Sequence, residues 1–264
     1  MTAEAPVTGH IGLNRAVRDA GILTRRNLFK YVRVPTLLLF STVQPIMFVL
    51  LFAFVFGGAI AGPDGNYINF LLPGIMVQTA LFGSTNTGIG LADDMSKGII
   101  DRFRSLPMAR SAVLMGRTLS DGIRNTFVVL LIVAVGYVIG FRFNAGFVKA
   151  VAAIALASLI SYAFSWISAN IGLSLKEVET VQAAGFIWIF PLTFASSVFV
   201  PVETMPSWLQ GFATINPVTV TADALRALVE GGPLQPALGQ SLLWIVGILV
   251  VFIPLGVRNY RKAV

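Results

Sequence analysis

The chain has 264 residues, 56% of them hydrophobic and only 12% charged, about half the charged share of a typical soluble domain. So few charges cannot cover the surface of a soluble globule of this length, and the composition predicts an all-α protein embedded in a lipid bilayer. The chain has no Cys and a single His, His10, which excludes disulfides and thiolate metal sites. Neither a bound metal or cofactor nor a Ser-His-Asp site is expected.

The first predicted element is residues 11–33, which precede the first long apolar run. At 100° per residue its basic side chains share one broad arc and most of its apolar side chains lie opposite. This pattern predicts an amphipathic helix on an anionic membrane surface. A disordered basic tail is the alternative.

Six apolar runs follow, each near the length of about 20 residues that a spanning helix needs. The third has an uncharged core from Thr126 to Phe141 and is expected to begin near Leu114. The composition therefore predicts six transmembrane helices, at residues 34–56, 68–92, 114–141, 151–173, 181–200 and 238–257.

Two segments between these runs are more than simple loops. Residues 93–124 carry six Lys or Arg and four Asp, and are too polar to be buried in lipid. Within this segment, the pattern of residues 97–108 predicts a short helix with an apolar face. That face either docks in a groove of another protein or lies on lipid. Prolines interrupt residues 201–236, so this segment cannot form one span and is predicted to form two short helices, either re-entrant or at the membrane surface. In the second helix, Arg226 and Glu230 are spaced to form an i, i+4 ion pair.

Lys and Arg residues predict the orientation of the spans. With six spans and both termini in the cytoplasm, sixteen of the 19 cations fall in cytoplasmic segments and three in outer segments. This asymmetry follows the positive-inside rule. The net charge is +7, and its positive residues fall in a few clusters between long uncharged runs. This distribution favours binding to anionic lipid headgroups over binding to nucleic acid.

The sequence lacks the features of an enzyme or an ion-coupled pump. No phosphate-binding G-x-x-x-x-G-K-[ST] motif is present, and no uncharged span core contains an ionisable residue. No catalytic residue is therefore expected. Any uphill transport would take its energy from a partner protein.

Polar residues within the spans are candidates for a transport pathway. Ser158, Ser161, Ser165 and Ser168 share an arc of the fourth span, where small residues mark either a polar path or close helix packing. Gln78 and Asn86 lie in the second span. Their side chains either line a cavity or satisfy backbone groups.

Two motifs resemble the type-2 permeases of ABC transporters, especially the daunorubicin-resistance branch. The first is the run from Gly98 to Pro107, Gly-Ile-Ile-Asp-Arg-Phe-Arg-Ser-Leu-Pro, followed by Arg110, Gly116-Arg117 and Asp121. The second is Pro201-Val-Glu-Thr-Met-Pro-Ser-Trp-Leu, followed by Asn216-Pro217 and Ala224-Leu225-Arg226. Residues 93–96, Asp-Asp-Met-Ser, depart from the Glu-rich sequence that many members have there.

The resemblance implies a permease subunit that pairs with a second permease subunit, as a homodimer or heterodimer, above two ATP-binding cassette subunits. ATP and Mg would bind to those partners, and the substrate would be an amphipathic drug, lipid, polyketide or glycan exported across a bacterial-type plasma membrane. The helix that couples the permease to the ATPase would include Gly98, Asp101, Arg102, Phe103, Arg104, Leu106 and Pro107. The outer gate would include Met205, Trp208, Leu209 and Phe212.

Two other functions fit the same topology. One is a membrane scaffold or assembly subunit with no transport path, and the other is an energy-independent lipid scramblase. Neither would need an ATPase, so co-purification with an ATP-binding subunit together with stimulation of its ATP hydrolysis separates the permease from both.

Overall fold

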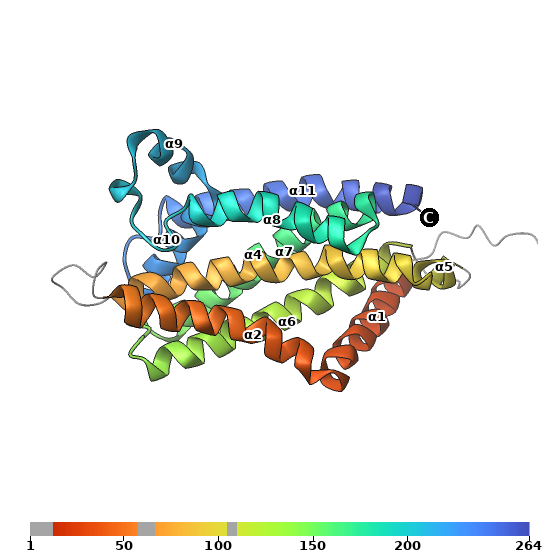
Figure 1. Cartoon of the computed structure of the whole chain (residues 1–264), viewed down its shortest axis with the longest axis horizontal. Coiled ribbons are helices and arrows are strands. Elements are labelled where there is room, and N and C mark those ends of the chain that lie inside the picture. The colour runs from red at the N-terminus through yellow and green to blue at the C-terminus, as the bar shows by residue number, and fades with distance from the viewer. Residues whose placement is uncertain (1–12, 58–66, 105–109, 264) are drawn as a thin grey trace, which may run out of the picture.

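The computed structural model describes residues 13–57, 67–104 and 110–263 of the chain. These residues form helices joined by short connections, with no strand among them, which confirms the predicted all-α class. Figure 1 shows most helices running along one axis, with α1 crossing obliquely at one end. The principal helices are α1 (Leu13–Arg33), α2 (Pro35–Leu50), α4 (Tyr67–Ser96), α5 (Ile99–Arg104), α6 (Arg110–Val138), α7 (Phe147–Leu175), α8 (Val178–Phe194), α9 (Ser207–Ile215), α10 (Pro217–Glu230) and α11 (Ala237–Ala263).

Within the described part of the chain, four helices are long and apolar enough to cross a membrane. They lie at Tyr67–Ser96, Ala112–Val138, Phe147–Leu175 and Ala237–Lys262. Two shorter apolar helices, Ser41–Val55 and Val178–Phe194, cover the first and fifth predicted spans. Four spans are thus supported by length and composition, and the count of six stays a prediction.

Local chemistry explains where the two shorter helices depart from the predicted bounds. The first predicted span is divided, because α2 continues as the π-helix η1 (Leu51–Phe56). Helix α8 ends at Phe194, short of the predicted end at Val200. The side chain of Asn216 donates hydrogen bonds to the carbonyl oxygens of Leu192 (2.8 Å) and Ala195 (2.9 Å), which satisfies acceptors that the end of a helix leaves open.

Helix α1 packs against the protein and does not rest on lipid alone. Ala20 and Leu23 are buried where α1 crosses α6, and a Cβ at Gly116 of α6 would lie 2.7 Å from the Cβ of Leu23. Thr24 Oγ1 adds a hydrogen bond to the carbonyl oxygen of Gly116 (3.3 Å). Residues 13–33 are therefore a docked helix, which excludes the disordered tail for this range.

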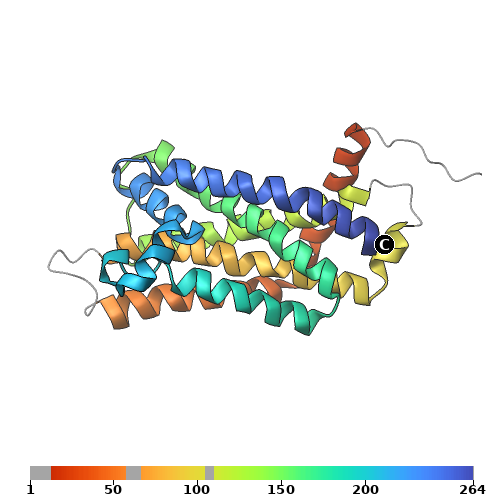
Figure 2. The ribbon, with the colours of Figure 1, turned by 90° about the horizontal axis from the view of Figure 1, so that it is seen from above.

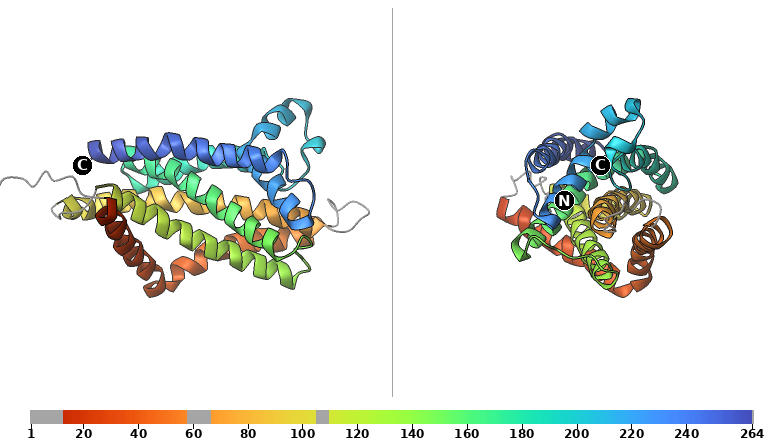
Figure 3. Two further views of the ribbon diagram at one scale, coloured as in Figure 1. Left: turned by 180° about the vertical axis from the view of Figure 1, so that it is seen from behind. Right: turned by 90° about the vertical axis from the view of Figure 1, so that its left-hand side faces the viewer.

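The two ends of the bundle carry different elements. Figure 2 and the left view of Figure 3 show α1, α5, the α7–α8 connection and the C-terminal end of α11 at one end. The α6–α7 turn and helices α9 and α10 lie at the other end. The basic clusters of the sequence that the structure describes therefore gather at one end of the molecule.

Arg226 holds together three segments at the end opposite α1. Its guanidinium stacks on Phe70 of α4, with Cζ 3.7 Å from the ring centroid, and donates to the carbonyl oxygen of Phe70 (3.0 Å) and to Ser197 Oγ (2.9 Å). Its ion pair is with Asp223 (2.6 Å), three residues earlier, rather than the predicted pair with Glu230. A residue that the sequence suggests is a surface cation thus fastens α10 to α4 and to the chain after α8.

Candidate functional site

A cavity of about 520 Å³ lies between α1, α2, α4, α6 and α8, in the half of the bundle nearer α1. Its wall combines polar and aromatic side chains. The predicted pathway residues Gln78 and Asn86 both line it, and Phe82 and Phe186 contribute apolar surface. Mixed polar and apolar lining is typical of sites for amphipathic small molecules.

Behind one wall of the cavity, Asp121 of α6 is the centre of a buried polar network. It is fully buried and accepts three hydrogen bonds, from Tyr31 Oη (2.7 Å), Thr87 Oγ1 (2.9 Å) and Arg117 Nε (3.1 Å). These donors come from α1, α4 and α6, so one carboxylate joins three helices. A buried charge requires such compensation, because an isolated one would be strongly destabilising.

Arg117 extends the network to the end of α4. It forms a second, longer ion pair with Asp94 (3.5 Å) and donates to the carbonyl oxygen of Asn86 (3.4 Å). Burial, reinforced by the negative charge of Asp121, raises the pKa of Tyr31 to about 12. The Tyr31 phenol therefore remains a hydrogen-bond donor at neutral pH, and α1 stays tied to α6.

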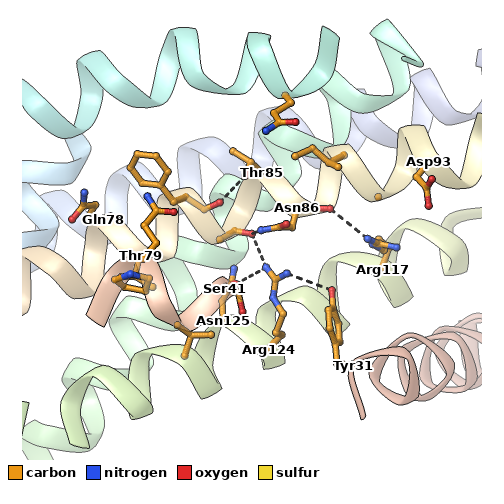
Figure 4. Close-up of a pocket in the computed structure, with 18 of the residues that line it drawn as sticks. Tyr31, Ser41, Gln78, Thr79, Thr85, Asn86, Asp93, Arg117, Arg124 and Asn125 are labelled. Carbon is orange, nitrogen blue, oxygen red and sulfur yellow. Dashed lines mark hydrogen bonds between the residues drawn. The ribbon is translucent and has the colours of Figure 1, made fainter. Parts of the chain in front are cut away.

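Arg124 faces the same cavity with different partners. Its side chain donates to the carbonyl oxygen of Gly83 (2.8 Å), to Asn125 Oδ1 (2.8 Å) and to Tyr31 Oη (3.5 Å), as Figure 4 shows. All three acceptors are neutral. The ion pairs with Asp94 and Asp121 belong to Arg117, and among the described residues Arg124 has no carboxylate in direct contact.

This network shows how part of residues 93–124, which are predicted to be too polar to be buried in lipid, is buried inside the protein instead. Helix α6 begins at Arg110, and Arg117, Asp121 and Arg124 are buried within its first half. The three residues fall at i, i+4 and i+7, on one face of the helix. Protein side chains, rather than water or headgroups, surround them, which is how ionisable groups are tolerated inside a bundle.

The serines of α7 lie mainly between helices. Ser161, Ser165 and Ser168 are buried and Ser158 is half-buried. Ser161 accepts a hydrogen bond from Asn125 Nδ2 (2.7 Å). Ser168 accepts one from the backbone N–H of Gly88 (3.2 Å). None of the four lines the cavity, so their contacts favour packing over the pathway.

Glycines allow α4 and α7 to pack closely beside these serines. A Cβ at Gly88 would overlap the backbone carbonyl of Ser168, and a Cβ at Gly172 would overlap the backbone of Gly88. Each helix thus fits against the other only because these positions have no side chain.

The predicted coupling segment, residues 97–108, is a short helix only in part. Helix α5 covers Ile99–Arg104, so it includes the backbones of Asp101, Arg102, Phe103 and Arg104, and the side chain of Arg102 is exposed. Gly98 precedes it with a φ of +65°, a conformation that favours glycine, and makes the turn out of α4. Leu106 and Pro107 lie outside the described residues.

The predicted outer-gate residues do not form a buried cluster within one chain. Met205 is buried and Leu209 is half-buried, while Trp208 is 78% exposed and Phe212 is 43% exposed. Met205 precedes α9, which carries the other three residues and projects from the end of the bundle opposite α1 (Figure 1). The ring of Trp208 therefore faces outward from this chain.

Comparison with known proteins gives the family. The profile described as ABC-2 type transporter matches residues 18–229, most of the chain. The chain belongs to this family. The match includes α1, the cavity helices α2, α4, α6 and α8, and the outer helices α9 and α10. The predicted ABC type-2 family is confirmed.

Three named relatives agree with the ABC-2 assignment. The chain is 35% identical to the daunorubicin resistance ABC transporter permease protein DrrB1 of Streptomyces coeruleorubidus, over 94% of this chain and 88% of that one. It is 29% identical to the probable doxorubicin resistance ABC transporter permease protein DrrC of Mycobacterium tuberculosis, over 91% and 87%. It is 26% identical to the putative transport permease ycf38 of Cyanophora paradoxa, over 93% and 89%. The predicted function, a permease of an ABC transporter, is confirmed by this family and these relatives.

The ABC-2 motifs in the sequence did not reveal the charged network of the cavity wall. Gly116-Arg117 and Asp121 were noted for their resemblance, and Gln78 and Asn86 for their polarity. Arg124 and Tyr31 were missed as functional residues. The i, i+4, i+7 spacing of the α6 charges was the available signal, because charges on one face of a helix next to an apolar run suggest a common partner.

Proposed function

We propose that this chain is the membrane-spanning subunit of an ATP-driven exporter that moves an amphipathic drug, lipid, polyketide or glycan outward. The observation that carries this proposal is the ABC-2 family match across residues 18–229. The cavity supports it, because polar groups and aromatic rings line one space between the helices. The energy comes from a separate subunit that binds ATP and Mg.

In this proposal the chain crosses the inner membrane of a bacterial-type cell six times. The four long apolar helices span it, together with the two shorter ones, α2 with η1 and α8. The end of the bundle that carries α1, α5 and the C-terminal end of α11 is cytoplasmic. Sixteen of the 19 Lys and Arg residues lie in the segments of that side and three in the outer segments, which follows the positive-inside rule. The end with α9 and α10 faces outward.

The proposed assembly has two permease subunits, identical or different, and two ATP-binding subunits. The segment Gly98–Pro107 seats on the ATP-binding subunit, with Arg102 exposed at the surface of this chain. Gln78 and Asn86 belong to the pathway, since both line the cavity. Trp208 and Phe212, exposed in one chain, meet the partner permease as part of the outer gate.

Co-expression with an ATP-binding subunit tests this function. We expect the two proteins to purify together, the permease to raise the rate of ATP hydrolysis, and vesicles containing both to accumulate a fluorescent amphiphile in an ATP-dependent manner. A scaffold would bind without stimulating hydrolysis. A scramblase would move labelled lipid without ATP.

Cysteine labelling tests the orientation, because the chain has no native Cys. Glu203→Cys in η2 (Val202–Thr204) and Arg258→Cys on α11 both place the thiol at exposed positions, at opposite ends of the bundle. We expect an impermeant maleimide to label Glu203→Cys in intact cells and Arg258→Cys only in inverted vesicles. Labelling of both from the same side would refute the topology.

A further inference from the structure

The cavity wall contains buried polar atoms that have no partner within the described chain. Arg124 Nε and Thr79 Oγ1 are both inaccessible and unpaired, and both residues line the cavity. Arg124 is 6% exposed and Thr79 is 7% exposed. Buried polar groups in folded proteins nearly always have a hydrogen-bond partner, so these two atoms leave the polar side of the cavity wall incompletely satisfied.

Positive side chains outnumber negative ones in the lining of the cavity. Four charged side chains line the cavity: Lys30, Arg117, Arg124 and Asp93. Asp93 is paired with Lys97 at 2.7 Å, outside the cavity, and Arg117 is paired with Asp121 and Asp94. Arg124 alone among the buried cations of this wall has only neutral acceptors. Asp121 is close enough to act electrostatically on Arg124, but its hydrogen bonds come from Tyr31, Thr87 and Arg117, so it makes no direct ion pair with Arg124. A buried guanidinium that lines a cavity and makes no direct ion pair can accommodate an anion next to it.

Apolar rings occupy another part of the lining. Phe82 of α4 and Phe186 of α8 have centroids 6.4 Å apart, and Phe48 of α2 lines the same space. These rings can pack against a flat ring system or an acyl chain, because contact with an aromatic face removes apolar surface from water. The cavity thus has a cationic part and an apolar part.

We propose that the cavity binds an amphiphile whose carboxylate or phosphate lies beside Arg124 and whose apolar body lies against Phe82 and Phe186. A cationic amphiphile is disfavoured there, since its charge would be placed near Arg124, Arg117 and Lys30. The view that this amphiphile is the transported substrate rests on the proposed function. The binding itself does not.

A matched pair of fluorescent probes tests the preference for an anion. Pyrenebutyrate and pyrenebutylamine share an apolar body and differ in the sign of their charge. Their binding to the purified chain in a non-ionic detergent is measured by energy transfer from the four tryptophans. We expect pyrenebutyrate to bind at least tenfold more tightly than the amine. Equal affinity, or tighter binding of the amine, would overturn the proposal, and this comparison needs no variant.

Substitution of Arg124 tests the position of the anion. We expect Arg124→Gln to weaken pyrenebutyrate binding about tenfold and to leave pyrenebutylamine unchanged or tighter, whereas Arg124→Lys retains most of the affinity. Arg258→Gln, exposed on α11, makes the same charge change away from the cavity and should have no effect. Thr79→Val, close in shape, tests the same wall without removing a charge, which guards against a folding defect in the Arg124 variant. Unchanged pyrenebutyrate affinity in both the Arg124→Gln and Thr79→Val variants would contradict the site.

Competition by phospholipids identifies the source of the anion. Displacement of pyrenebutyrate by phosphatidylglycerol, but not by phosphatidylcholine, supports a site for an anionic lipid headgroup. Lack of displacement by either lipid supports a site for a smaller anionic amphiphile. Stimulation of the ATP-binding subunit is measured separately. Arg124-dependent binding of pyrenebutyrate without stimulation of ATP hydrolysis would support the anion site and refute the proposed exporter function. Stimulation of ATP hydrolysis without Arg124-dependent binding would support the exporter function and refute the anion site.

Discussion

Loss of the charge on Asp121 should be among the most destabilising single changes in this chain. Asp121→Asn keeps the size of the side chain but leaves Arg117 buried with only the longer contact to Asp94, at 3.5 Å. Removal of one member of a buried ion pair typically costs about 3–5 kcal/mol, because the remaining charge has no compensation. The hydrogen bond from Tyr31 also weakens, which loosens α1 from α6.

The magnitude can be checked by thermal unfolding of the purified chain in detergent. At about 2–4 °C per kcal/mol for a chain of this size, the expected fall in Tm is roughly 6–20 °C. The double variant Arg117→Gln with Asp121→Asn should recover part of the loss, since it removes both charges together. A Tm within about 2 °C of the parent for Asp121→Asn, or a double variant less stable than the sum of the singles, would refute this account of the network.

Three further predictions concern other parts of the chain. Phe103→Asp or Leu106→Asp should abolish stimulation of ATP hydrolysis by the ATP-binding subunit while the permease inserts normally, because a charge on the docking face must be desolvated without a partner. Unchanged stimulation in a well-inserted variant would show that this segment does not couple the two subunits. Trp208→Ala should change the free energy of unfolding of the single chain by no more than about 0.5 kcal/mol, since the ring is 78% exposed, yet lower the ATP-dependent accumulation of the fluorescent amphiphile in vesicles. A large loss of stability, or full transport, would contradict the assignment of Trp208 to the gate. Gly172→Ala should destabilise the chain by about 1–3 kcal/mol because its Cβ overlaps the backbone of α4, whereas Gly211→Ala, with nothing within 4 Å, serves as a control whose Tm stays close to the parent.

Composition and hydropathy predicted the class of the fold and several of its helices. Long apolar runs lack the charges that a soluble surface needs, so α4, α7 and α11 were recognisable without any tertiary information. At the start of α10, Asn216 caps the helix by accepting a hydrogen bond from the N–H of Val218 (2.9 Å), and Pro217 occupies the first turn, both of which are local preferences of these residue types. Such features are local, and local chemistry is what a sequence displays.

The cavity wall depends on contacts between distant residues and was not predictable in this way. Tyr31 lies ninety positions before Asp121 along the chain, and Thr87 lies 34 positions before it. The polarity of residues 93–124 indicated that they avoid lipid, but it did not indicate that pairing across helices buries three of them inside the protein. The exposed ring of Trp208 was similarly unpredictable, because an apolar face on a short helix does not specify what covers it.

The close approach of α4 and α7 limits how this protein can change shape. Because backbone meets backbone at Gly88 and Gly172, these two helices have little freedom to slide and are expected to behave as a rigid unit. Other walls of the cavity are built from α2, which contains Pro45 and continues as the π-helix η1, and from α8, which contains Pro191. Helix α4 has a proline of its own, Pro73, but it lies fifteen residues before the close contact at Gly88. Opening and closing of the cavity should therefore come from hinge motion of α2 and α8 against a fixed α4–α7 frame.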